Sequence, residues 1–211
     1  MSPRYKNLES LTAAHELKRA AIRKRLAEFR AVKPQQYFYE LAYCCMTPQS
    51  SAINAAKAQQ ALMMHDFERQ DIDPEPLLHQ KDYYIRFHIT KAKLLLAMKS
   101  NYSMIHSIIM NGMRGTEKRE WLVKNVRGLG LKEATHFLRN IGMNEGMAIL
   151  DRHILKNLRK YNVIRSLPRT LTKKKYLSIE RSFQKFANEI GIPIDELDLV
   201  FWSNEAGEIL K

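Results

Sequence analysis

The stretch VRGLGLKEATHFLRNIG, residues 126–142, decides the fold because it joins two helical patterns through a short glycine turn. Gly128 and Gly130 flank one leucine, so the backbone can take a positive φ there and a phosphate can approach bare N–H groups. Apolar residues then recur at the i, i+3, i+4, i+7 spacing of one helix face: Ala134, Phe137, Leu138 and Ile141. The pattern predicts a helix–hairpin–helix motif over about residues 118–142.

The composition indicates a globular protein with an acidic partner. Of the 211 residues, 45% are apolar, and the formal net charge is +13, which favours nucleic acid as the partner. A ribosomal or membrane-surface protein would also carry such a charge. The two cysteines, Cys44 and Cys45, are adjacent, which excludes a structural zinc site and a four-cysteine iron–sulfur cluster. With no signal-like or membrane-spanning apolar run, we expect a cytoplasmic protein without a membrane partner.

Helical periodicity runs through almost the whole chain, and no segment alternates as a strand would. Residues 65–76 are polar and predict a connection between helices. No linker or repeat divides the chain, so we expect one all-α unit, residues 1–211, with two helical lobes around a cleft and the terminal helices in one lobe. The expected helices cover residues 11–33, 37–46, 48–63, 83–98, 101–110, 118–126, 151–161, 173–190 and 195–202.

Two charged residues near the glycine turn invite a chemical interpretation. Lys132 stands two residues after Gly130, at a helix start, where it is either one more charge for a phosphate or a nucleophile. Asp151 follows nineteen residues later and precedes another helical pattern, so the simplest role for it is an N-cap. If the two helices pack together, both side chains can face a common cleft.

These segments carry a family resemblance. GLGLKEA followed by ILDRH resembles the helix–hairpin–helix DNA glycosylase superfamily, in which such a lysine and aspartate form the active site. PQQYFYELAYCCMTPQSSAINAAKA, IRFHITKAKLL and DLVFWSNEAGEILK resemble its archaeal-type 8-oxoguanine DNA N-glycosylase/lyases, over roughly residues 35–211. The resemblance implies base-excision repair without a cofactor: Lys132 forms a Schiff base and cleaves the strand by β-elimination, and Asp151 stabilises the transition state.

The same resemblance implies how the damaged base is held. Phe87 and Trp202 would face the two sides of the flipped base, and the terminal carboxylate of Lys211 would accept a hydrogen bond from it. Gln49 would enter the duplex beside the orphaned base. Without the resemblance, the two aromatic residues are more simply core residues, Gln49 a polar turn residue, and Lys211 a solvated terminus.

The remaining expectations concern DNA binding. Gly128, Gly130, Arg127 and His153 are expected to contact DNA, although a lone histidine on a helix is more often structural. We expect a monomer that binds duplex DNA containing oxidised guanine and has no metal site, except that turn carbonyls could hold a monovalent cation. Two other functions compete: a glycosylase for another lesion, such as an alkylated base, and a helix–hairpin–helix module that binds DNA without catalysis. The lysine, the aspartate and the aromatic pair favour the first function.

Overall fold

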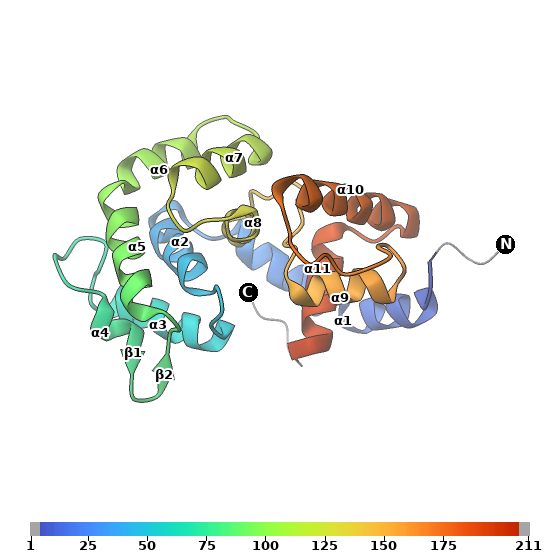
Figure 1. Cartoon of the computed structure of the whole chain (residues 1–211), viewed down its shortest axis with the longest axis horizontal. Helices are drawn as coiled ribbons and strands as arrows, with labels where there is room; N and C mark the ends of the chain where they lie inside the picture. Colours follow the sequence, from blue (N-terminus) through green and yellow to red (C-terminus); the bar gives the residue numbers. More distant parts are fainter. Residues whose placement is uncertain (1–4, 207–211) are drawn as a thin grey trace. The chain divides into compact units, whose positions relative to one another are not determined.

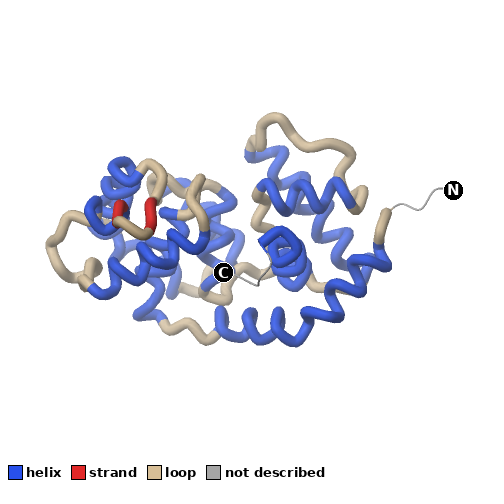
Figure 2. The backbone as a smooth tube through the Cα atoms, turned by 90° about the horizontal axis from the view of Figure 1, so that it is seen from below, coloured by secondary structure: helices blue, strands red, loops and turns tan. Residues whose placement is uncertain are grey.

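The computed structural model describes residues 5–206, and most of their regular structure is helical (Figure 2). The only strands in this described part are β1 (His79–Gln80) and β2 (Tyr83–Tyr84), which pair antiparallel. None of the described helices is both long and apolar enough to cross a membrane. The chain divides into two compact units: a terminal unit, which holds the chain up to Arg30 and from Asn144 onward, and a middle unit, Ala31–Met143.

The terminal unit consists of four described helices: α1 (Leu8–Arg30), α9 (Arg152–Lys160), α10 (Lys173–Ile190) and α11 (Ile194–Ala206). Helix α11 packs against the other three (Figure 1). Stacked rings fill its core, with Phe201 5.4 Å from Tyr161 and 5.7 Å from Phe183 between centroids. The buried carboxylate of Glu196 in α11 is paired with His15 and with Arg23, both in α1. This unit is therefore held by an aromatic core and a polar link between α1 and α11.

The middle unit is built around one central helix. Helix α2 (Tyr37–Met46) is buried along its whole length and contacts α3, α5 and α8 (Figure 1). Glu40 of α2 accepts a hydrogen bond from Asn140 Nδ2 at 3.1 Å, which links α2 to α8. The other elements of the unit are η1 (Pro34–Gln36), α3 (Ala52–Met64), α4 (Glu75–Leu78), α5 (His88–Ser100), α6 (Tyr102–Met110), α7 (Gly115–Asn125) and α8 (Leu131–Asn140).

One predicted element starts in the wrong place. The helix expected over residues 83–98 begins only at His88, and residues 83–84 form strand β2 instead. Two local features stop the helix earlier: Phe87 has the left-handed φ of 60°, and the Arg86 N–H donates to Ser50 Oγ at 2.9 Å rather than to a helical carbonyl. The two-residue strands were not foreseen because they are too short to show an alternating pattern.

The predicted helix–hairpin–helix is confirmed as α7, residues 126–130 and α8; we call residues 126–130 the glycine turn. The expectation of positive φ is right for Gly128, at +89°, and wrong for Gly130, whose φ of −93° any residue can adopt. At Gly130 the constraint is space, since a Cβ would stand 3.0 Å from Glu133 Oε2. Leu129, in the turn that joins the two helices, is buried, as its apolar character predicted.

Gly128→Ala is expected to lower the free energy of unfolding by about 1–2 kcal/mol, because alanine disfavours positive φ and its Cβ would press on Leu94. The Cβ would stand 2.7 Å from Leu94 Cδ1, but this atom is the flexible end of a side chain, so the backbone cost should dominate. Gly112→Ala is the matched control, since a Cβ there meets nothing within 4 Å. Equal urea midpoints for the two variants would contradict the prediction.

Candidate active site

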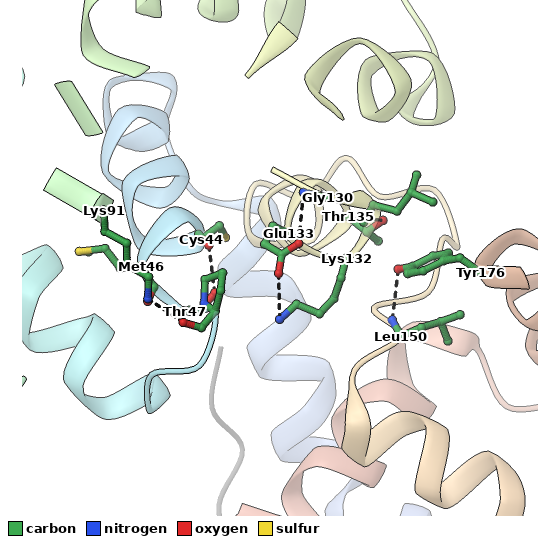
Figure 3. A network of polar contacts seen from close by, with 12 residues as sticks. Cys44, Met46, Thr47, Lys91, Gly130, Lys132, Glu133, Thr135, Leu150 and Tyr176 are labelled. Carbon is green, nitrogen blue, oxygen red and sulfur yellow. Dashed lines mark hydrogen bonds and ion pairs between the residues drawn. The ribbon is translucent and has the colours of Figure 1, made fainter. Parts of the chain in front are cut away.

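Lys132 lies in the first turn of α8, beside Glu133 (Figure 3). Its Nζ is 3.1 Å from Glu133 Oε1, and the other carboxylate oxygen, Oε2, accepts a hydrogen bond from the Gly130 N–H at 3.2 Å. The side chain of Lys132 is 28% exposed and that of Glu133 14%. One carboxylate therefore both caps α8 and holds the lysine amine, which remains partly open to solvent.

A second lysine stands near this pair. Lys91, in α5, is 5% exposed, and its Nζ donates to Met46 O at 2.6 Å (Figure 3). It also donates to Pro48 O at 2.6 Å and to Ser50 Oγ at 3.2 Å. These acceptors lie at and just after the C-terminal end of α2, where backbone carbonyls lack helical partners. Lys91 therefore fixes the chain that follows α2.

The charges around Lys132 are coupled to Lys91 and Cys45. Burial lowers the pKa of Lys91 to about 8; the charge of Cys45 acts to raise it, the charge of Lys132 lowers it further, and that of Glu133 raises it. Burial, together with the charge of Glu133, raises the pKa of the Cys45 thiol to about 12. At neutral pH the thiol is therefore uncharged, and Cys45 adds no charge to this cluster.

Lys91→Met is expected to remove a pH-dependent part of the stability. The pKa of Lys91 falls from 10.5 to about 8 on folding, so between these pH values the unfolded chain binds more protons than the folded protein. The free energy of unfolding of the wild type therefore increases as pH rises through this window. Relative to the variant, the gain should be about 2 kcal/mol by urea titration. Lys57→Met, at an exposed lysine paired with Asp82, is the control. Parallel pH curves for wild type and Lys91→Met would contradict the prediction.

Gln49 and Phe87, two candidate residues from different segments, are linked through Ser50. Both are exposed and both have the left-handed backbone conformation, with φ of 57° and 60°. The Ser50 hydroxyl next to Gln49 accepts from the N–H of Arg86, next to Phe87, at 2.9 Å. Left-handed backbone costs a non-glycine residue about 1–2 kcal/mol, and such strain clusters at functional sites. The structure therefore brings these two turns of the middle unit together.

Asp151, His153 and Trp202 are brought together in the terminal unit. The predicted N-cap is confirmed, since Asp151 Oδ1 accepts from the N–H groups of His153 and Ile154, each at 2.8 Å. The His153 ring lies 5.3 Å from the Trp202 ring between centroids, and its Nε2 is 3.1 Å from Arg152 Nε. Both rings are half-buried, so His153 supports the tryptophan that was expected to face the base.

The other candidates are placed as follows. Arg127 is exposed in the glycine turn, whereas Lys211 lies outside the described residues, so its expected role stays a prediction. Within the described part of the chain, no group of three or more His, Cys, Asp or Glu side chains could hold a metal ion.

Sequence reasoning missed Glu133 and Lys91. The spacing of Glu133, three residues after Gly130, was a usable signal because it fits a capping box; Lys91 gave none, since it sits in an ordinary helical pattern.

Comparisons with known proteins point to one family. A family model described as 8-oxoguanine DNA glycosylase matches residues 22–192. A Fusobacterium nucleatum protein named 8-oxoguanine DNA glycosylase/AP lyase is 41% identical over 198 residues, which cover 90% of each chain. A Methanocaldococcus jannaschii protein of the same name is 32% identical over 205 residues, 93% of this chain and 96% of its own. The M. jannaschii 8-oxoguanine glycosylase/lyase crystallised with a 15mer DNA containing 8-oxoguanine superposes with a TM-score of 0.84 at 30% identity, covering 96% of this chain and all of the other.

Proposed function

This chain belongs to the 8-oxoguanine DNA glycosylase family, and we propose that it has the activity for which that family is named. It excises 8-oxoguanine from duplex DNA and then cleaves the strand at the emptied site. Relatives named 8-oxoguanine DNA glycosylase/AP lyase match nearly its whole length, which supports both activities in one chain.

The observation that carries the chemistry is the position of Lys132. Its amine stands at the start of α8, directly after the glycine turn, and is partly open to solvent. In the proposed reaction the amine attacks C1′ of the damaged nucleoside, and the base leaves with the electrons of the glycosidic bond. The resulting Schiff base makes the C2′ proton acidic, so that β-elimination releases the 3′ phosphate.

The other candidates take supporting roles in this proposal. Backbone N–H groups at Gly128 and Gly130, with Arg127, bind phosphates of the DNA strand, and Gln49 fills the space left by the flipped base. Phe87 and Trp202 face the base, Lys211 accepts a hydrogen bond from it, and Asp151 stabilises the positive charge that develops on the sugar. The protein acts as a monomer, with residues 1–211 as one glycosylase. The Ser50 link between the Gln49 and Phe87 turns and the contact between His153 and Trp202 support these roles.

The test is borohydride trapping on a panel of duplexes. The duplexes contain 8-oxoguanine, uracil, a methylated purine or only normal bases, and reduction of the Schiff base leaves a stable protein–DNA adduct. We expect the adduct with 8-oxoguanine and at most traces with the others. An adduct chiefly with the methylated purine would indicate a glycosylase for alkylated bases. Binding of every duplex with no adduct would indicate a DNA-binding module without catalysis, and either result would overturn the proposed function.

A further inference from the structure

We propose that Glu133 is a catalytic residue, which takes the proton from the Lys132 ammonium before the amine attacks. The inference rests on the proposed function, because it assumes that Lys132 is the nucleophile. Its structural basis is the 3.1 Å separation between Lys132 Nζ and Glu133 Oε1 within the middle unit. A lysine must lose a proton to attack, and a carboxylate oxygen ion-paired with Nζ at 3.1 Å is close enough to receive it.

The orientation of Glu133 is fixed by its second oxygen. Glu133 Oε2 accepts from the Gly130 N–H at 3.2 Å, so Oε1 remains directed at Lys132 Nζ (Figure 3). Gly130 leaves room for this arrangement, since a Cβ there would stand 3.0 Å from Oε2 and the carboxylate would have to shift slightly. The carboxylate is therefore a held acceptor rather than a freely rotating surface group.

Two neighbouring titratable groups interact with the pair. The charge of Lys91 in α5 couples to both Lys132 and Glu133, and that of Cys45 in α2 couples to Glu133. The thiol is uncharged at neutral pH, so the charge that reaches the pair from α5 and α2 is that of Lys91. Lys91 Nζ is held by backbone carbonyls of residues 46 and 48, so it is engaged elsewhere and does not compete as a nucleophile.

The protons and electrons balance through the step. The Lys132 ammonium gives one proton to Glu133, and the free amine forms a bond to C1′ while the C1′–N9 electron pair leaves with the base. The substituted amine loses a second proton to the departing base. Its lone pair then expels O4′, which takes the proton stored on Glu133, and the sugar opens to the protonated Schiff base. Glu133 is thereby returned to a carboxylate, and the total charge is unchanged.

Glu133→Gln separates proton transfer from capping. The glutamine oxygen can still accept from the Gly130 N–H, but the amide cannot take a proton from Lys132. We expect the single-turnover rate of borohydride trapping on a preformed abasic site to fall about 100-fold near pH 7. The rate should approach that of wild type near pH 10, because hydroxide can then take the proton in place of the carboxylate. Glu133→Asp, which keeps a carboxylate, should retain a rate between the two.

Glu117→Gln is the matched control. Glu117 holds the same position in α7, where its Oε2 accepts from the Arg114 N–H at 2.9 Å, but it pairs with Arg114 rather than with a lysine. Its trapping rate should equal that of wild type at every pH. A thermal midpoint for each variant shows whether the fold is kept.

Three results are decisive. A wild-type pH profile in Glu133→Gln would show that Glu133 only caps α8, and a faster reaction near pH 7 would show that it holds Lys132 protonated; either overturns the inference. Wild type that forms no adduct at any pH would instead refute the proposed function itself, so the two failures are distinguishable. Three results together would support Glu133 as the proton acceptor. Glu133→Gln would have a low trapping rate near pH 7, its rate would recover at high pH, and Glu133→Asp would be partly active.

Discussion

Lys132→Gln is expected to abolish the borohydride adduct and to reduce excision of 8-oxoguanine by at least about 1000-fold. Glutamine cannot form a Schiff base, although its side chain is polar and suits this partly exposed position in the first turn of α8. The fold should be kept because Lys132 is partly exposed and its only described partner is the adjacent Glu133. The measurement is the single-turnover rate of base release, with the adduct followed on a denaturing gel.

Lys185→Gln is the control for Lys132→Gln. Lys185 is an exposed lysine of α10 that also has a glutamate partner, with its Nζ 3.9 Å from Glu189 Oε1. Its variant should trap DNA like wild type. If Lys132→Gln still formed an adduct, another amine would be the nucleophile, and peptide mapping of the trapped complex would identify it. If the trapped DNA were attached to Lys91, the assignment of Lys132 as the nucleophile would be wrong. Lys91 is the alternative to check first, because its pKa of about 8 leaves some neutral amine at pH 7.

Much of the fold could be predicted because helix patterns and caps are local. Apolar spacing located α8, and the helical pattern that follows Asp151 located an N-cap at this residue, which the structure confirms. The start of α5 could not be predicted, because it depends on a hydrogen bond between Arg86 and Ser50, which are far apart in the sequence. The constraint at Gly130 was misjudged for a similar reason, since it arises from the side chain of Glu133.

The candidate site was predictable to a smaller extent. The residue types at Lys132 and Asp151, together with the family resemblance, identified the chemistry, but periodicity cannot show which groups surround an amine. Lys91 occupies a buried position where most helices carry an apolar residue, and its role became visible only through its acceptors at Met46, Pro48 and Ser50. Charge coupling across α2, α5 and α8 is a property of the packed unit, not of any one segment.

Asp151→Asn is expected to slow excision of 8-oxoguanine by about 100- to 1000-fold while leaving the thermal midpoint nearly unchanged. Asparagine caps helices as well as aspartate does, so its side-chain oxygen can still accept from the N–H groups of His153 and Ile154. Only the negative charge is lost, and with it the stabilisation of the sugar as the base departs. Asp151→Ala should also lose the cap and about 1 kcal/mol of stability.

Two comparisons distinguish a catalytic Asp151 from a cap. Thr172→Ala removes the N-cap of α10, where Thr172 Oγ1 accepts from the Lys175 N–H at 3.3 Å, and should lower stability without slowing excision. On a preformed abasic site no base has to leave, so Asp151→Asn should slow adduct formation far less than it slows excision. Equal losses on both substrates would place Asp151 in lysine activation rather than in base departure. If Asp151→Asn excised 8-oxoguanine at the wild-type rate, Asp151 would act only as a helix cap, because the cap is the function that this variant retains.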